Sequence, residues 1–497
     1  MRVLLLSMPD SFEHMPAVGI RMPNGALSSL AANIDSHHEV AIADLILAQS
    51  RVRETVTELV CGFQPDVVGL SIMTFQRKTA KKIMTLVKQL LPQAVIVAGG
   101  YDPSLAVEAY TGTENRTDFV VRGEGESTFC ELLRALEGGI AFDAIPGLSY
   151  RHGDSFRHNP DRPAEAIANG RIRLPKRSAR VLKDYRFLGS PVDVIETSRG
   201  CTFDCSFCSI IEMRGRNFFE YSMERVLDDI RDAFNHGARS IFFVDDNIGL
   251  NVKRFESLCR EIIQAKLNRI EYIVQAMTST IANHGDTLVP LMAEAGFKYV
   301  FLGIENVLDS DLAFLKAASK NYRRENGKRT GNATIRAIEY LHAHKMYVVG
   351  GLIVGSPDDT EDSIKTNLDF VKQYVDYPYI QHPTPYPRTP MTTDLAAQGL
   401  IFKHDESEYD GTTAVVHTKH VEAENVEFLR WREDRWIKTR HVRALLRDRP
   451  FFVLRNAIRM FEHTFRGSTV KTFLGLEDER KAFARYQTIR SRERNYL

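Results

Sequence analysis

SRGCTFDCSFC, residues 198–208, sets three cysteines within eight positions of the chain. Thiolates are the usual ligands of iron–sulfur clusters, and three of them on one tight loop can hold three corners of a cubane. The fourth iron is then free to bind a substrate, as an open zinc site is. A closed zinc or electron-transfer site would need a fourth Cys or His, and none lies close in the sequence. The spacing therefore indicates a 4Fe–4S cluster on Cys201, Cys205 and Cys208.

The three cysteines follow a short apolar run that opens a series of alternating strands and helices. The expected strands are Val192–Thr197, Ser240–Val244, Ile270–Ala276, Tyr299–Gly303, Tyr347–Val354 and Tyr379–His382. Helices are expected between them at Ser222–His236, Val252–Ala265, Thr287–Gly296, Ala333–His344 and Thr360–Gln373. Six such units are too few for a closed eight-fold barrel. We therefore expect a partial (β/α)6 TIM-type barrel, with its site at the carboxyl ends of the strands.

The N-terminal part shows a second α/β pattern. Five short apolar runs predict strands at Val3–Leu6, Val40–Ala43, Asp66–Ser71, Ala94–Ala98 and Phe119–Arg122. Helical patterns separate or follow them at Leu27–Ile34, Val52–Phe63, Lys78–Leu90 and Glu126–Leu136. This alternation is typical of a doubly wound, Rossmann-like parallel sheet, which binds ligands at the carboxyl ends of its strands.

The remaining segments complete the predicted organisation. Residues 1–140 form the first α/β domain, and 141–190, with scattered Pro, Gly and Arg, form a linker with a short strand at Leu148–Arg151. Residues 191–395 form the barrel. Residues 396–497 form a helical extension, with helices at Val426–Arg447 and Pro450–Phe465 whose basic character is typical of a solvated face.

Composition excludes several classes of protein. The chain of 497 residues is 43% apolar and 26% charged, as globular proteins of several domains are. Its 65 Lys and Arg balance 64 Asp and Glu, so charge gives no reason to expect nucleic acid as a partner. No apolar run approaches the roughly 20 residues that cross a bilayer, and Val3–Leu6 is too short for a signal peptide. We expect a cytoplasmic protein without stable membrane insertion.

The cysteine loop resembles the radical S-adenosylmethionine (radical SAM) superfamily, whose signature is Cys-x3-Cys-x2-Cys with an aromatic residue before the last cysteine. Phe207 fills the aromatic position. The resemblance implies that the open iron chelates S-adenosylmethionine, and that an electron from the cluster cleaves it to a 5′-deoxyadenosyl radical. That electron would come from an external donor such as flavodoxin or ferredoxin. The cofactors carry this chemistry, and the protein orients and shields them.

Three polar residues end the second barrel strand, where this family places the group that holds the methionine amino group. Here the sequence is Asp245-Asp246-Asn247 instead of the commoner Gly-Gly-Glu, a variant found in the cobalamin-associated branch. Carboxylate and amide oxygens suit an ammonium group. One of the three can alternatively cap the helix that follows.

Later strands carry further residues that the resemblance assigns to S-adenosylmethionine. Gln275 on the third strand and Glu305 on the fourth face the barrel mouth if the strands alternate regularly. Gly351 on the fifth would let adenine approach the backbone. After the sixth strand, residues 384–390 read TPYPRTP, and Arg388 stands where the family usually has glycine.

The first domain resembles the cobalamin-binding module that precedes such barrels. The residues that carry the resemblance end the third to fifth strands: Ser71, Gly99, Gly100, Gly123 and Glu124. A serine and a glycine pair at neighbouring strand ends can line a groove for a nucleotide tail, and a helix N-terminus serves polar groups. The same glycines also fit plain tight turns. The His motif of other cobalamin proteins is absent, since His14 stands in a stretch that does not match it.

Together these features favour a cobalamin-dependent radical SAM methyltransferase acting on an unactivated carbon. The expected substrate is a small molecule of natural-product or lipid type, and the sequence does not identify it. A radical cyclase, oxidase or rearranging enzyme of the same architecture is the first alternative. A non-catalytic iron–sulfur sensor is the second.

Overall fold

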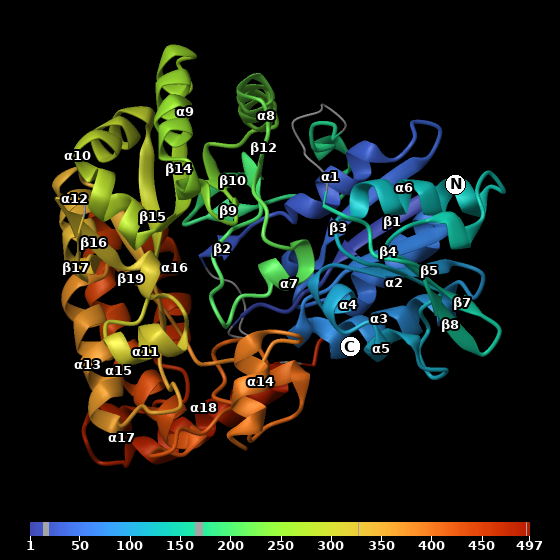
Figure 1. Ribbon diagram of the computed structural model, residues 1–497. Helices are drawn as coiled ribbons and strands as arrows, with labels where there is room; N and C mark the ends of the chain where they lie inside the picture. The colour runs from blue at the N-terminus through green and yellow to red at the C-terminus, as the bar shows by residue number, and fades with distance from the viewer. Residues whose placement is uncertain (13–18, 165–171, 327, 494) are drawn as a thin grey trace.

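The computed structural model describes residues 1–12, 19–164, 172–326, 328–493 and 495–497. It contains two α/β units that lie side by side, the first in blue and cyan and the second in green and yellow in Figure 1. Helices of the C-terminal part, in orange and red, run along the second unit and lead back towards the first. His14 lies outside the described residues.

Runs of Val, Leu and Ile form the first sheet, in the strand order β3-β1-β4-β5-β6-β7-β8. Its strands are β1 Arg2–Ser7, β3 Glu39–Asp44, β4 Val67–Ser71, β5 Val95–Gly99, β6 Phe119–Val121, β7 Leu148–His152 and β8 Ser155–His158. The first five are parallel, which confirms the doubly wound prediction. Because the strand order reverses between β1 and β4, the carboxyl ends there are the expected ligand site.

Helices cover both faces of this sheet and bury its aliphatic side chains. One face packs on α2 Val52–Phe63 and α3 Arg77–Leu90, and the other packs on α1 Gly25–Asn33 and α6 Gly125–Leu136. Short helices α4 Tyr101–Leu105 and α5 Glu108–Thr111 follow β5.

Part of the segment expected as a linker belongs to the first sheet. β7 pairs antiparallel with β6, and β8 pairs antiparallel with β7. The reason is packing, because Tyr150 is buried against Phe142, which in turn contacts Phe119. The proposed boundaries at residues 140, 190 and 395 stay a prediction.

The second sheet has the order β19-β18-β15-β14-β13-β10-β9-β2 and curls into a partial barrel. All six predicted parallel strands are present: β10 Ser190–Ile195, β13 Ser240–Phe243, β14 Glu271–Met277, β15 Phe297–Glu305, β18 Tyr347–Ile353 and β19 Tyr377–Gln381. Two short strands that the sequence analysis does not predict, β9 Arg186–Phe187 and β2 Ile20–Arg21, extend the sheet at the β10 edge. β9 pairs antiparallel with β10, and β2 pairs antiparallel with β9.

Helices pack on the outer side of the curled sheet and bury its main core. They are α8 Met223–Asn235, α9 Val252–Gln264, α10 Thr278–Ala295, α12 Thr334–Ala343 and α13 Glu361–Tyr374. α10 begins at Thr278 instead of the expected Thr287. Gly285, which weakens the helical pattern there, lies against Tyr340, and a Cβ at this position would overlap the Tyr340 ring. Packing thus overrides the weak local preference.

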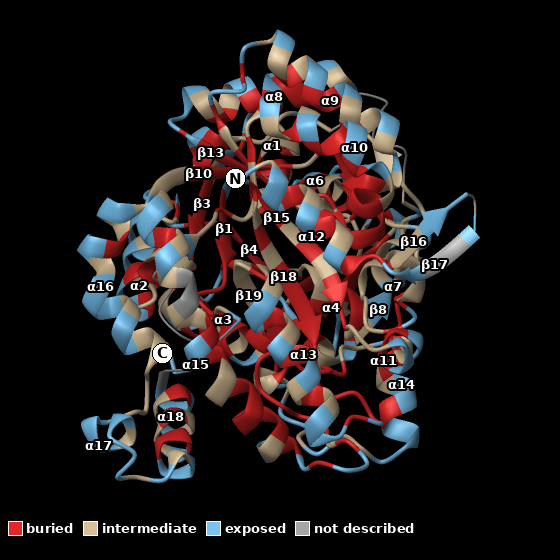
Figure 2. Ribbon diagram, turned by 90° about the vertical axis from the view of Figure 1, so that its left-hand side faces the viewer, coloured by how far each residue is buried: buried red, intermediate tan, exposed pale blue. Residues whose placement is uncertain are grey.

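The C-terminal part is helical, as predicted. Its helices are α14 Pro390–Ala397, α15 Ala423–Asp448, α16 Pro450–Thr464, α17 Val470–Phe473 and α18 Glu479–Glu493. Figure 2 shows that buried residues concentrate in the two sheets, whereas α16 and α17 are largely exposed. None of the helices within the described ranges has the length and apolar character needed to cross a membrane.

Short elements complete the structure around the barrel. They are α7 Ile210–Arg214, α11 Asp309–Phe314, the ribbon of β11 Ser198–Arg199 with β12 Phe219–Glu220, and the ribbon of β16 Tyr322–Glu325 with β17 Lys328–Asn332.

Candidate functional site

A cavity of about 420 Å³ lies between the two units. The first unit contributes the ends of β4 and β5 and the turn between β6 and α6, and the second contributes the segments after β10 and β13. This is where a doubly wound sheet binds its ligand. Six of the predicted cofactor-binding residues line the cavity: Ser71, Gly99, Gly100, Gly123, Glu124 and Asp246.

Two glycines shape the wall of the cavity because of their backbone conformation. Gly100 has a φ of +100°, and an added Cβ would lie 2.8 Å from the backbone N and O of Ile72. Gly123 has a φ of +74°, and an added Cβ would meet nothing within 4 Å. The first glycine is therefore required for close packing, and the second for a left-handed turn beside open space.

Ser71 accepts a hydrogen bond from a residue that the sequence analysis did not select. Asn24 Nδ2 donates to Ser71 Oγ over 3.3 Å, and Asn24 Oδ1 caps α1 by accepting from the N–H of Leu27. The N-termini of α1 and α6 both line the cavity. The partial positive charge at these helix N-termini favours polar or anionic ligands there. The signal that could have found Asn24 is its N-cap position directly before a buried helix.

Ser206, which lies between Cys205 and Cys208, anchors the cysteine loop to the barrel. Its N–H donates to the carbonyl of Leu315 over 3.0 Å, and its Oγ donates to the carbonyl of Phe314 over 2.9 Å. Cys205 is buried, and Cys201 and Cys208 are half-buried. Burial raises the pKa of Cys205 to about 11 and that of Cys208 to about 12. Both are thiols until a metal takes them as thiolates.

The three cysteines form an all-sulfur set of ligands on one loop, and none of them is in a disulfide. Thiolates in such an arrangement suit three corners of an iron–sulfur cluster.

Asp245 braces the loop that leads to the cysteines. It is buried, and its carboxylate accepts from the N–H and Oγ1 of Thr197 and from Oγ of Ser198, at 2.5–3.2 Å. Burial raises its pKa to about 6, against the effect of these hydrogen bonds. These hydrogen bonds from within the protein thus occupy most of the acceptor sites of the Asp245 carboxylate. Its predicted part in holding methionine stays a prediction.

Asp246 and Asn247 are neighbours in the chain but have different hydrogen-bond partners. Asp246 accepts from the N–H of Gly200 over 2.8 Å and from Arg214 over 3.4 Å, and it lines the cavity. Asn247 Nδ2 donates to the sulfur of Cys201 over 3.5 Å and to that of Met277 over 3.3 Å. Its Oδ1 is buried and has no hydrogen-bond partner among the described residues. An acceptor left open beside the cysteines suits an ammonium donor.

Glu305 ends β15 in a strained conformation with a φ of +60°. Lys320, which the sequence analysis did not select, donates from Nζ to Glu305 Oε1 over 2.6 Å. The same Nζ lies 5.8 Å from the centre of the Phe207 ring. Although burial disfavours the charge, Glu305 and Cys205 raise the pKa of Lys320 well above its usual value. Lys320 follows α11, outside every strand motif, so no local pattern could have identified it.

Gln275 and Gly351 lie near the same aromatic ring on the inner face of the barrel. Gln275 pairs with Phe301 in the sheet and is half-buried. A Cβ at Gly351 would lie 2.9 Å from Cε1 of Phe301. The absence of a side chain at Gly351 therefore makes room for the Phe301 ring. The predicted contact of Gly351 with adenine stays a prediction.

Arg388, which stands where the family usually has glycine, has a φ of +64°, the left-handed conformation that glycine favours.

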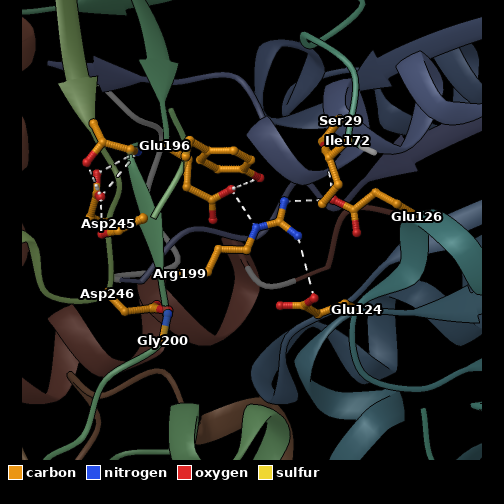
Figure 3. Close-up of polar contacts among 12 residues, drawn as sticks. Ser29, Glu124, Glu126, Ile172, Glu196, Arg199, Gly200, Asp245 and Asp246 are labelled. Atoms are coloured by element: carbon orange, nitrogen blue, oxygen red, sulfur yellow. Dashed lines mark hydrogen bonds and ion pairs between the residues drawn. The ribbon is translucent and has the colours of Figure 1, made fainter. Parts of the chain in front are cut away.

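Arg199 joins the cysteine loop to the first unit, as Figure 3 shows. Its guanidinium donates to Glu196 Oε2 and to Glu126 Oε1, both over 2.7 Å, and lies 3.9 Å from Glu124. Ser29 Oγ also donates to Glu126, over 2.8 Å. Burial favours the neutral acid, but Arg199 outweighs it and holds the pKa of Glu126 at about 2. The pKa of Glu124 is raised by burial, only partly offset by Arg199 and Arg214.

Comparisons with known families match both units of the chain. Residues 15–133 match the model of the B12 binding domain, and residues 195–371 match that of the radical SAM superfamily. The chain therefore carries a B12-binding domain followed by a radical SAM domain.

Relatives share this chain over most of its length. An uncharacterized methyltransferase of Pyrococcus horikoshii is 29% identical over 433 residues, 86% of this chain and 90% of the relative. The anaerobic magnesium-protoporphyrin IX monomethyl ester cyclase of Synechocystis is 25% identical over 492 residues, 96% of this chain and 91% of the relative. The hopanoid C-3 methylase of Methylococcus capsulatus is 26% identical over 362 residues, 71% of this chain and 64% of the relative.

Solved structures share the fold. The cobalamin-dependent radical enzyme OxsB, with aqua-cobalamin and S-adenosylmethionine bound, superposes with a TM-score of 0.66 at 18% identity, covering 99% of this chain and 71% of that one. The radical methyltransferase TsrM of Kitasatospora setae, with cobalamin and a 4Fe–4S cluster bound, gives 0.64 at 20% identity, covering 80% and 78%. At these identities the likeness concerns the fold.

The residues present fit the cofactors that the two domains imply. In the radical SAM domain, three unpaired thiols and the open Oδ1 of Asn247 match a cluster and an amino group. In the B12-binding domain, the glycine-walled cavity and two helix N-termini match a polar tail. The described lining contains no histidine, so it offers cobalamin no imidazole ligand.

Proposed function

We propose that this protein is a cobalamin-dependent radical SAM methyltransferase that methylates an unactivated carbon of a small-molecule or lipid-type substrate. The observation that carries the proposal is the single cavity lined by both domains. It brings the turn at Gly123 and Glu124 into one space with Asp246. Asp246 in turn accepts a hydrogen bond from Gly200, the residue before Cys201. Methyl transfer between two cofactors requires such a shared space. The methyltransferase relatives from Pyrococcus and Methylococcus favour the same reaction.

When bound, the cluster, S-adenosylmethionine and cobalamin supply a 5′-deoxyadenosyl radical and a transferable methyl group. Cys201, Cys205 and Cys208 would hold the cluster through thiolates. Asn247 would accept a hydrogen bond from the methionine ammonium group through its open Oδ1, which its Nδ2 contact with the sulfur of Cys201 leaves free. Lys320 holds the Glu305 carboxylate in place beside the same loop.

The B12-binding domain forms the other wall of the reaction space. Ser71 and the glycines at the strand ends take the polar tail, and Glu126 anchors this wall to Arg199.

Product analysis tests the proposal without knowledge of the substrate. The anaerobically reconstituted holoenzyme is incubated with S-adenosylmethionine and reduced flavodoxin, which we propose as the class of electron donor. Methyl transfer to cobalamin releases S-adenosylhomocysteine. Reductive cleavage by one electron releases methionine and the 5′-deoxyadenosyl radical, which becomes 5′-deoxyadenosine when it takes a hydrogen atom from a substrate or another C–H donor. We expect both nucleoside products, with S-adenosylhomocysteine depending on added cobalamin. Release of 5′-deoxyadenosine alone would contradict a methyltransferase.

A radical cyclase is the second candidate. The observation that favours it is the match to the Synechocystis cyclase along 96% of this chain. Cyclisation consumes S-adenosylmethionine only to 5′-deoxyadenosine, so the same product analysis separates the two reactions.

A further inference from the structure

The largest group of exposed apolar side chains lies on α16 and α17, away from the cavity that the proposed reaction uses. Phe451 is 85% exposed, Leu454 71%, Ile458 76% and Phe461 56%. Their spacing of three and four residues places them on one face of α16. α16 lies at the edge of the molecule and shows mostly exposed residues in Figure 2.

This face is separate from the face that α16 uses for packing. Val453 is buried, and Phe452 lies against Gly189, so these two residues face the protein. Helix α16 therefore has a second apolar face that no described part of the chain covers. A monomeric protein rarely exposes such a contiguous patch without an interaction that uses it.

The exposed face continues onto α17. The Phe473 ring lies 6.0 Å from the ring of Phe461 and 5.0 Å from that of Phe465, so α17 packs on the end of α16 through these aromatic rings. Val470, at the start of α17, is 74% exposed, and Leu476, which follows α17, is also 74% exposed. The apolar surface thus spans a helix and the turn that follows it.

Basic side chains flank this surface. Arg455 and Arg459 are exposed on α16, next to the apolar face, and Lys471 is exposed on α17. Residues 450–476 contain four Lys and Arg and a single carboxylate, Glu462, whereas the whole chain is balanced at 65 against 64. Glu477, which follows and accepts hydrogen bonds from Thr469 and Thr472 at α17, is paired with Arg485. An apolar face bordered by basic residues matches the boundary between the acyl chains and the anionic headgroups of a bilayer.

We propose that α16 and α17 dock the protein on the surface of an anionic membrane. The apolar face of Phe451, Leu454, Ile458 and Phe461 lies in the interface, and Arg455, Arg459 and Lys471 contact acidic headgroups. This docking needs no helix that crosses the bilayer. It is independent of the proposed reaction, so its test does not depend on activity.

Vesicle flotation of the full-length protein tests the docking. Vesicles of phosphatidylcholine alone are compared with vesicles that also contain phosphatidylglycerol. We expect the wild type to float with the anionic vesicles only, and high salt to weaken the binding. Arg455→Gln with Arg459→Gln should lower partitioning roughly thirty-fold, since each basic residue near the surface contributes about a fivefold factor.

Phe451→Glu with Ile458→Glu should abolish flotation with the anionic vesicles. The matched control is Phe402→Glu with Ile335→Glu, two exposed apolar residues outside this segment that should leave flotation unchanged. Circular dichroism checks that the variants fold. The proposal is overturned if the wild type never floats, or if flotation persists in both variant pairs. It is also overturned if light scattering shows a dimer that only the Glu variants dissociate, because a second copy then covers this face.

Discussion

Arg199, two residues before the first cluster cysteine, donates to Glu126 at the start of α6 over 2.7 Å and thereby ties the radical SAM domain to the B12-binding domain. Both residues line the shared cavity. Arg199 is buried and the side chain of Glu126 is only 12% exposed, so each charge depends on the other to offset its loss of hydration. A specific contact therefore joins the cysteine loop to the wall of the cavity.

Removal of the Glu126 charge should weaken this contact. We expect Glu126→Gln to lower the free energy of unfolding by about 3 kcal/mol, because Arg199 loses a buried partner. Cobalamin affinity should fall as well, while iron content stays unchanged. Chemical denaturation and absorbance titration with cobalamin measure the two effects. Asp35→Asn is the matched control, because Arg134 binds Asp35 by two hydrogen bonds within one domain at a more exposed site. It should cost no more than about 1 kcal/mol.

The same carboxylate predicts a pH dependence. Pairing holds the pKa of Glu126 at about 2 in the folded protein, below the ordinary value of 4.5. A lowered pKa stabilises the fold above the unfolded value, and the contribution is lost as pH falls towards about 2. The difference in stability between wild type and Glu126→Gln should thus be constant above pH 5 and shrink progressively between about pH 4.5 and 2. A difference that grows on acidification would refute the assignment.

Single replacement of the loop cysteines should remove the cluster. Cys201→Ala, Cys205→Ala and Cys208→Ala should each lose most of the bound iron and the visible absorbance, because two thiolates do not hold a cubane stably. Cys61→Ala, at an exposed cysteine outside the loop, should keep both. Iron analysis after anaerobic reconstitution measures the outcome. Full iron retention in a loop variant would mean that its sulfur is not a ligand.

Asn247 offers a test of the open acceptor beside Cys201. Asn247→Ala should weaken S-adenosylmethionine binding by about tenfold, since a charge-assisted hydrogen bond contributes about 1.5 kcal/mol or more. Asn247→Asp keeps an oxygen acceptor and should retain binding. The change in the electron paramagnetic resonance spectrum of the reduced cluster on adding S-adenosylmethionine reports the binding. If Ala and Asp behave alike, the acceptor has no part in it.

A comparison of two glycine variants can separate the effect of backbone strain from a role of Gly123 in cobalamin binding. Gly123 and Gly138 both have positive φ, +74° and +85°, and an added Cβ would meet nothing within 4 Å at either. Gly123→Ala and Gly138→Ala should therefore destabilise the fold to a similar extent, by about 1 kcal/mol. Only Gly123 lines the cavity, so only Gly123→Ala should lower cobalamin affinity. Equal affinities in the two variants would show that Gly123 serves the turn alone.

Much of the fold could be predicted because it depends on local patterns. The six barrel strands and the five parallel strands of the first sheet follow from short apolar runs, whose burial the sequence directly reflects. The cysteine spacing likewise places its ligands on one loop. By contrast, the sequence predicts a strand at Leu148–Arg151, which is present as β7, but not that it joins the first sheet, and it does not predict β8. β7 joins that sheet because of aromatic packing around Phe142.

The sequence by itself determined the cysteine loop, the succession of strands along the chain and the residues at the ends of those strands. Only the tertiary structure decided that Arg199 meets Glu126, that Lys320 reaches Glu305, and that Asn247 keeps an acceptor open beside Cys201. Periodicity records whether a side chain is buried, but not which distant residue it meets. Such partners are fixed by how the two sheets pack, and a separation of 73 positions between Arg199 and Glu126 leaves no local trace of that packing.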